Sequence, residues 1–271
     1  MFPFYRVFGI EIPMYGTMFI LAAAVSIGFA MLRAKKRGIQ PDDTLYTGLF
    51  AVIGAIIGAK LLYIITMIVP IISSWDKITE SGVGFWEIIG YATGGFVFFG
   101  GLIGGTIGGI IYLKIFKLNI ADFADLVAPF VPLAHAIGRV GCFLGGCCYG
   151  IETRFGVLFD NSPALPPELH GVRLLPVQLI ETDVNLLLVL ILLLYERYCE
   201  KKDKKSNGKS LLLYLIMYSV SRFTLEFFRG DAARGVFFGI STSQIISIVL
   251  FCVSILLMAF YDKIRNIKNK I

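Results

Sequence analysis

Long runs of apolar residues, separated by short polar or charged segments, make up most of the chain. A helix needs roughly 20 residues to cross a hydrocarbon core of about 30 Å, so seven of these runs are long enough to be membrane spans. The predicted spans lie near residues 13–32, 45–70, 95–115, 121–144, 176–195, 210–228 and 241–261. The pattern predicts an all-α polytopic integral membrane protein with about seven transmembrane helices.

Composition supports a membrane protein and excludes an ordinary soluble one. The 271 residues are 56% hydrophobic and only 16% charged, with a mean hydropathy of +0.77. The net charge of +6 comes mainly from basic residues beside the predicted spans. Such residues set membrane topology, so they do not indicate a nucleic-acid partner.

The distribution of basic residues orients the predicted spans. Sixteen lysines and arginines follow the first, third, fifth and seventh spans, whereas six lie on the opposite side. Because cytoplasmic loops carry the excess of positive charge, we expect the N-terminus outside and the C-terminus in the cytoplasm. We expect one transmembrane domain, residues 1–271, with outer loops near 71–94, 149–175 and 229–240. Prolines in the second loop indicate an ordered surface loop.

The end of the fourth predicted span places charged and nucleophilic groups inside an apolar segment. His135, Arg139 and Cys142 are spaced i, i+4 and i+7, so they share one helix face. Gly138 and Gly141 leave room beside them. An arginine at mid-span costs roughly 2.5–3.5 kcal/mol on insertion scales, and such a residue is by default a functional-site candidate.

The sixth predicted span carries a second polar stripe. It is formed by Tyr218, Arg222, Glu226 and Arg229. The topology places the unusual elements at the outer ends of their spans: both stripes, Tyr15, Gly94–Gly101 and Gln178–Glu181. Three arginines against Glu226 predict a net positive pocket. A planar guanidinium suits bidentate contacts to phosphate, so an anionic phospholipid headgroup is the expected ligand, with a structural charge network as the alternative.

Closely spaced glycines mark the third predicted span. They are Gly94, Gly95, Gly100, Gly101, Gly104, Gly105, Gly108 and Gly109. Small residues at this spacing let membrane helices approach closely. A sharper interpretation is that the segment from Gly94 to Gly101 leaves its backbone open to a ligand headgroup. Gly54 and Gly58 on the second span indicate packing alone.

The order of these motifs resembles the prolipoprotein diacylglyceryl transferase family over nearly the whole chain. The signature-like segment is Gly138-Arg139-Val140-Gly141, followed by Phe143 and Tyr149-Gly150. Further matches are Tyr15-Gly16, Gly54-Ala55 through Lys60 to Tyr63, Gly94-Gly95, Gly100-Gly101-Leu102-Ile103-Gly104, Ala121-Asp122, Ala128-Pro129, Pro176, Gln178-Leu179, Glu181, Tyr218, Arg222 and Glu226-Phe227-Phe228-Arg229.

The resemblance implies transfer of diacylglycerol from phosphatidylglycerol to the lipobox cysteine thiol of a prolipoprotein signal peptide, in the bacterial cytoplasmic membrane. Glycerol 1-phosphate would leave on the extracytoplasmic side. Arg139 and Arg222 would hold the phosphodiester and stabilise the leaving phosphate. Glu226 would orient Arg222. The remaining implied roles are site shaping by Tyr15 and Tyr218, support of the mouth by Arg229 and closure of the signature loop by Gly150. No cofactor, metal or nucleic acid is implied.

This chain departs from the family pattern at four positions. Phe99 and Leu175 stand where familiar members have histidines, and Cys142 and Cys147 stand where they have asparagine and glutamate. Phe99 cannot take a proton. The candidate replacements are His135 and a thiolate at Cys142 or Cys147, since a thiol beside arginines has a depressed pKa.

Three alternatives stay open at this level. The chain could be a divergent paralogue with another acceptor, or a phospholipid-binding homologue without catalysis. The third alternative is a thiol redox or metal protein that uses His135, Cys142, Cys147 and Cys148, although their spacing matches no common zinc motif.

Overall fold

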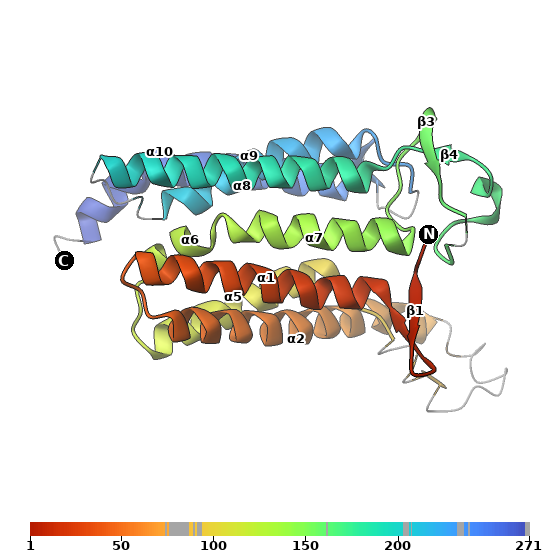
Figure 1. Ribbon diagram of the computed structural model, residues 1–271, viewed down its shortest axis with the longest axis horizontal. Coiled ribbons are helices and arrows are strands. Elements are labelled where there is room, and N and C mark those ends of the chain that lie inside the picture. The colour runs from red at the N-terminus through yellow and green to blue at the C-terminus, as the bar shows by residue number, and fades with distance from the viewer. Residues whose placement is uncertain are drawn as a thin grey trace. The chain divides into compact units, whose positions relative to one another are not determined.

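The computed structural model describes residues 1–73, 75, 87–88, 90, 94–160, 162–202, 206, 208–231, 236–237 and 239–268. The chain forms two compact units (Figure 1). The first contains residues 1–30 and 121–271, and the second contains residues 31–120. Much of the predicted outer loop 71–94 and part of loop 229–240 lie outside the described residues. The prediction of one transmembrane domain stays a prediction.

Helices form most of the first unit. They are the first part of α1 (Met14–Lys36), then α6 (Ile120–Val127) from Ala121 on, α7 (Phe130–Gly145), α8 (Val177–Lys201), α9 (Lys209–Glu226) and α10 (Thr242–Lys268). Helix α7 packs on α8, and α9 packs on both α8 and α10. In Figure 1 the last three helices run side by side along their length.

The fourth predicted span is two helices and not one. Helices α6 and α7 meet at a bend of 41°. Pro129 lies at the break, and it has no N–H to continue the helical hydrogen bonds while its ring clashes with the preceding turn. The single helix expected over 121–144 is therefore wrong, because this proline divides it.

Short strands, which the pattern of long apolar runs did not predict, frame one end of this unit. They form the antiparallel pairs β1 (Phe4–Val7) with β2 (Ile10–Pro13), β3 (Glu152–Leu158) with β4 (Arg173–Leu174), and β5 (Val236–Phe237) with β6 (Ile240–Ser241). A 3-10 turn, η1 (Pro167–Leu169), lies between β3 and β4. Tyr149, Phe159, Leu165 and Leu174 are buried together there. These four residues thus form a small hydrophobic core, against which Met1 and Phe143 also pack.

The second unit consists of α2 (Pro41–Ser73) packed along α5 (Phe98–Ile115), with the end of α1. Glycines make the contact between α2 and α5 possible. A Cβ at Gly58 would lie 2.3 Å from the Gly100 carbonyl oxygen, and a Cβ at Gly104 would lie 2.2 Å from that of Gly54. The predicted packing role of Gly54 and Gly58 is confirmed.

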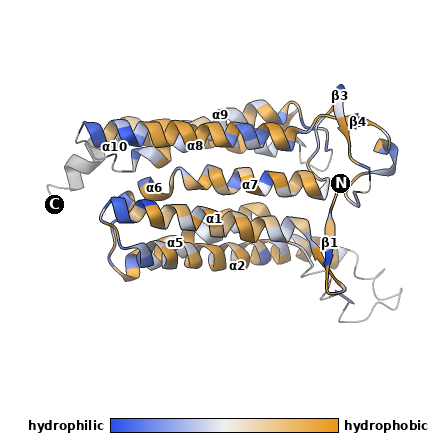
Figure 2. Cartoon of the chain, viewed as in Figure 1, coloured by the Kyte–Doolittle hydropathy of each residue, from blue (hydrophilic) through white to orange (hydrophobic). Residues whose placement is uncertain are grey.

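Among the described residues, five helices are long and apolar enough to cross a membrane, and the bent pair α6–α7 makes a sixth if it forms one span. The predicted sixth span is α9, which carries Lys209, Arg222 and Glu226 and falls outside this group. Figure 2 shows apolar residues along the helices and hydrophilic residues gathered near their ends. The all-α polytopic membrane fold is confirmed, and the orientation of the termini stays a prediction.

Candidate functional site

One buried carboxylate joins the two arginines that the sequence singled out. Glu181 on α8 has a side chain that is 4% exposed. Its Oε2 lies 2.5 Å from Arg139 Nε on α7, and its Oε1 accepts a hydrogen bond of 3.2 Å from Arg222 Nη1 on α9. Guanidinium groups from two helices therefore meet at one residue of a third.

Arg222 is held on several sides. Its Nη2 lies 2.8 Å from Glu226 Oε2, one turn later on α9, and donates a 3.1 Å hydrogen bond to Ser243 Oγ at the start of α10. With Glu181, these contacts tie α8, α9 and α10 together around one cation. The expected Arg222–Glu226 pair is present.

Arg139 is held through one edge of its guanidinium. Its Nε–H donates to His135 Nε2 at 3.2 Å, and the same nitrogen forms the ion pair with Glu181. Within the described part of the chain, no hydrogen bond from its two terminal amino groups is found. The Tyr218 ring lies 5.6 Å from that of His135 and closes this side of the cluster. Arg139 thus offers two amino groups in a fixed orientation.

The hydrogen bond that His135 accepts from Arg139 changes the role expected of this histidine. Because Nε2 accepts the hydrogen bond from the Arg139 Nε–H, the single ring proton of the neutral imidazole lies on Nδ1. His135 is therefore arranged to position Arg139. This geometry does not favour the general-base role considered from the sequence.

The third arginine has its own partner. Arg229 Nε and Nη2 donate to the two oxygens of Asp231 at 3.1 and 3.0 Å, which is a bidentate pair. Burial raises the pKa of the Asp231 carboxyl, and the Arg229 cation opposes this. Three arginines therefore face Glu181, Glu226 and Asp231. The expectation of a net positive pocket is wrong, because the carboxylates of Glu181 and Asp231 join that of Glu226 opposite the three arginines.

Main-chain hydrogen bonds close the mouth of the site. The Gly150 N–H donates to the Leu175 carbonyl at 2.8 Å, the Ile151 N–H to that of Phe228 at 3.0 Å and the Gly230 N–H to that of Tyr149 at 3.1 Å. A Cβ at Gly150 would lie 2.5 Å from Val177 and 2.7 Å from two carbonyl oxygens. The predicted closure of this loop at Gly150 therefore has a steric reason.

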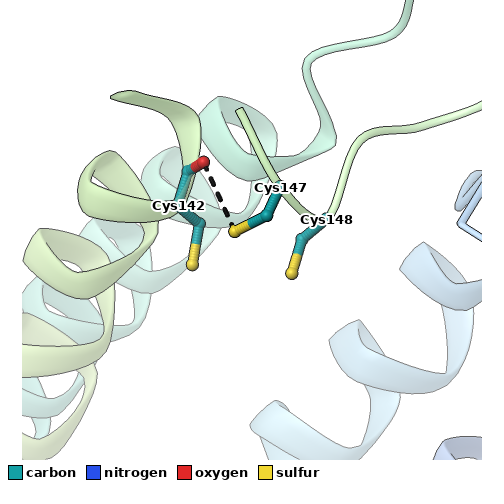
Figure 3. Close-up of side chains that lie close together, drawn as sticks. All are labelled: Cys142, Cys147 and Cys148. Carbon is teal, nitrogen blue, oxygen red and sulfur yellow. Dashed lines mark hydrogen bonds between the residues drawn. The ribbon is translucent and has the colours of Figure 1, made fainter. Parts of the chain in front are cut away.

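The last turn of α7 and the loop that follows it carry three thiols. Cys142, Cys147 and Cys148 have sulfur atoms within 4.8 Å of one another (Figure 3). Contacts with the Cys142 and Cys147 thiols lower the pKa of the Cys148 thiol. Burial opposes this effect, and the cations of Arg229 and Arg139 add to it. His135, which the sequence analysis grouped with these thiols, is not a member of the cluster found among the described residues.

Comparison with known proteins identifies the family. The family model described as prolipoprotein diacylglyceryl transferase matches residues 3–260. The chain belongs to the prolipoprotein diacylglyceryl transferase family. It is similar to the phosphatidylglycerol–prolipoprotein diacylglyceryl transferase of Clostridium tetani, with 38% identity that covers 93% of this chain and 94% of that protein.

Two further relatives carry the same kind of name. The second such transferase of Clostridium perfringens is 36% identical over 93% of this chain and 92% of its own length. The transferase of Clostridioides difficile is 31% identical over 84% of this chain and 83% of its own length. The resemblance inferred from the motifs is confirmed.

The family signature packs against α1. A Cβ at Gly141 would lie 2.8 Å from Met18 Cβ and 3.8 Å from Tyr15 Cα, so the space expected beside Gly141 is filled by α1. At Gly138 no atom of the described residues lies within 4 Å of an added Cβ, so space is open there. Gln178, also predicted from the family motifs, is buried and donates to the Cys147 carbonyl at 2.7 Å.

The predicted site residues of the third span lie in the other compact unit. A Cβ at Gly95 would meet the Tyr63 ring at 2.4 Å, and one at Gly100 would meet α2 backbone, so these glycines serve packing. The headgroup-binding roles of Gly94, Gly101 and Phe99 stay predictions. Glu181 is the central residue to which the sequence analysis gave no role. Its spacing from Gln178 and Asn185, at i−3 and i+4, could have indicated a polar face on α8.

Proposed function

We propose that this protein transfers diacylglycerol from phosphatidylglycerol to the lipobox cysteine of a prolipoprotein, at the extracytoplasmic side of the bacterial cytoplasmic membrane. The observation that carries the proposal is the meeting of Arg139 and Arg222 at Glu181. Family membership over residues 3–260 supports it. Sidedness rests on the distribution of basic residues.

The reaction replaces one bond to carbon with another. The acceptor sulfur forms a C–S bond with the terminal glycerol carbon of the diacylglyceryl group, and the C–O bond between that carbon and the phosphate breaks. The electron pair of that bond stays on the phosphate oxygen, so glycerol 1-phosphate leaves with an additional negative charge. The thiol proton is released. Charge therefore develops on the phosphate, where fixed donors lower the barrier most.

The two arginines have different tasks in this proposal. Arg139 presents its terminal amino groups to the phosphate as a bidentate fork. Arg222 is a positioning residue, because Glu181, Glu226 and Ser243 already hold its amino groups. It keeps Glu181 in place, and Glu181 in turn orients Arg139.

Charge balance suits turnover in this scheme. The three arginines and three carboxylates cancel, so the site recognises phosphate through oriented N–H donors and not through net charge. A strongly cationic pocket would hold the more highly charged product tightly. A neutral site with preorganised donors stabilises developing charge and still releases glycerol 1-phosphate.

Complementation and chemical analysis together test the proposal. A strain depleted of its own transferase should regain diacylglyceryl-modified lipoproteins, detected by mass spectrometry, when it expresses this chain. The purified protein should modify a lipobox peptide in phosphatidylglycerol vesicles. Arg139→Lys should slow this reaction about 100-fold or more, because lysine keeps the charge but loses the fork. Arg154→Ala, at an exposed position on strand β3, is the matched control.

Two results would contradict the proposal. Well-expressed protein that neither rescues the strain nor modifies the peptide would exclude the transferase activity. Equal rates for the Arg139→Lys variant and the wild type would exclude the bidentate role of Arg139.

A further inference from the structure

The three thiols at the end of α7 form a compact donor set that the reaction described above does not use. Figure 3 shows the side chains of Cys142, Cys147 and Cys148 close together. Their sulfur atoms all lie within 4.8 Å of one another. Around a zinc ion with Zn–S bonds of about 2.3 Å, neighbouring sulfurs are separated by roughly 3.8 Å. Shifts of about 1 Å or less would therefore bring all three to one ion.

The backbone is shaped to gather these thiols. Gly146 ends α7 in the left-handed region with φ of 71°, and the Cys147 N–H then donates to the Cys142 carbonyl at 3.1 Å. Cys148 also has a positive φ of 63°, which is uncommon for a residue with a side chain. Adjacent cysteines seldom ligate together in regular backbone. The turn at Cys148 is a local conformation that lets both sulfurs approach Cys142.

The surroundings hold this turn in place. Gln178 on α8 is fully buried and donates to the Cys147 carbonyl at 2.7 Å. The Ser162 hydroxyl donates to the Gly146 carbonyl at 3.0 Å. Contacts of this kind orient metal ligands and fix their geometry. The donor set found among the described residues has three members, which leaves one position of a tetrahedral ion open.

We propose that Cys142, Cys147 and Cys148 bind a zinc ion whose fourth position takes the acceptor thiol of the prolipoprotein. This inference rests on the proposed transferase function. An open fourth position is typical of catalytic zinc, and a thiol that coordinates the metal is deprotonated. This proposal departs from the expectation, drawn from the sequence, that no metal takes part.

The chemistry fits the rest of the site. Binding to zinc releases the acceptor's proton to solvent. The zinc-bound thiolate then attacks the terminal glycerol carbon, a C–S bond forms, the C–O bond breaks, and its electron pair leaves on glycerol 1-phosphate. Three protein thiolates and Zn²⁺ carry a net charge of −1, which keeps the bound acceptor sulfur electron-rich.

The position of the cluster favours this role. Cys142 follows Arg139 by three residues on α7, a rise of about 4.5 Å, and residues at this spacing are neighbours on a helix. The acceptor sulfur would thus be activated one turn from the guanidinium proposed to hold the phosphate.

The first test measures the metal site without reference to activity. The full chain, purified in detergent under anaerobic conditions, is loaded with Zn²⁺ and desalted, and metal is counted by mass spectrometry. We expect about one zinc per chain, sulfur-to-metal charge-transfer absorption with Co²⁺, and three Zn–S contacts by X-ray absorption. Adding a lipobox peptide should raise the number of Zn–S contacts from three to four. The same peptide with serine in place of cysteine should leave that number at three.

Variants and thiol labelling locate the metal. Cys147→Ser and Cys148→Ser should each weaken zinc binding at least about 100-fold, whereas Cys252→Ser, an exposed position on α10, should not change it. If a variant does not fold, alkylation of the wild-type chain decides. Zinc should protect Cys142, Cys147 and Cys148 at least tenfold and leave Cys252 reactive. Absence of zinc protection, or a disulfide between two of the three in anaerobically isolated protein, would overturn the proposal.

The activity test separates this inference from the function on which it rests. Chelator-treated protein should lose at least about tenfold of its transfer rate, and Zn²⁺ should restore it. Full transfer by metal-free protein would overturn the zinc proposal and leave the transferase function intact. Zinc bound through three sulfurs, without transfer under any condition, would refute the transferase function and the thiol activation while the metal site itself stands.

Discussion

The carboxylate of Glu181 is the most revealing single group to remove. It contacts Arg139 through one oxygen and Arg222 through the other. The variant Glu181→Gln keeps the shape but gives the side chain one acceptor end and one donor end. Whichever way the amide turns, an N–H group faces one of the two guanidiniums. The substitution therefore removes a charge and introduces a donor–donor contact.

The magnitude follows from burial. The Glu181 side chain is 4% exposed, and those of Arg139 and Arg222 are 13% and 11% exposed. Breaking a buried ion pair by removing one partner costs about 3–5 kcal/mol, because the remaining charge is uncompensated. Arg139 also loses its fixed orientation. Loss of one oriented donor to developing charge lowers kcat about 100- to 1000-fold.

Two assays on the same preparation test this reasoning. Thermal unfolding in detergent should show a large loss of stability for Glu181→Gln, and diacylglyceryl transfer to a lipobox peptide should fall at least 100-fold. Glu168→Gln, in the exposed turn η1, is the matched control and should lie within about 0.5 kcal/mol of the wild type. Wild-type stability and more than half of the transfer rate in the Glu181→Gln variant would refute the role given to this carboxylate.

Substitutions at three further positions, two of them with a matched control, have definite expected results. His135→Leu should slow transfer about 10- to 100-fold, because Arg139 loses a charged hydrogen bond. His135→Gln should keep most of the rate and the same dependence of rate on pH. Loss of the acidic or alkaline limb of the pH–rate profile in the glutamine variant would indicate that His135 acts as a base. Gly104→Leu should prevent the close approach of α2 and α5 and lower the thermal unfolding midpoint, whereas Gly28→Ala, with nothing within 4 Å of its added Cβ, should not. Asp125→Ala should cost about 1.5–3 kcal/mol in chemical unfolding, because its carboxylate accepts the N–H groups of Gly208 and Ser210 at the start of α9; an unchanged unfolding curve would exclude this cap.

The apolar pattern predicted the fold class well, because membrane spans are set by length and hydrophobicity. It failed at positions where local backbone chemistry decides. Pro129 divides the fourth predicted span, and the short strands at one end depend on pairings too local to appear in long apolar runs.

The sequence predicted the residues of the candidate site better than the interactions between them. Helical spacing placed His135, Arg139 and Cys142 on one face, but spacing cannot show which carboxylate from another helix will meet an arginine. Glu181 lies 42 positions after Arg139 in the chain and contacts it directly. The neutral net charge of the site could therefore be recognised only from the three-dimensional structure. The pairing of Arg229 with Asp231, two residues away, could have been anticipated from the sequence.

The mouth of the site is built from peptide groups and not from side chains. Gly150, Leu175 and Phe228 come from three separate segments and are joined by amide-to-carbonyl contacts. Substitutions at neighbouring positions can thus alter the chemistry of this region while its outline persists. Such a frame lets side chains at the rim vary while the backbone architecture persists, and it marks this rim as a place where new specificities can arise.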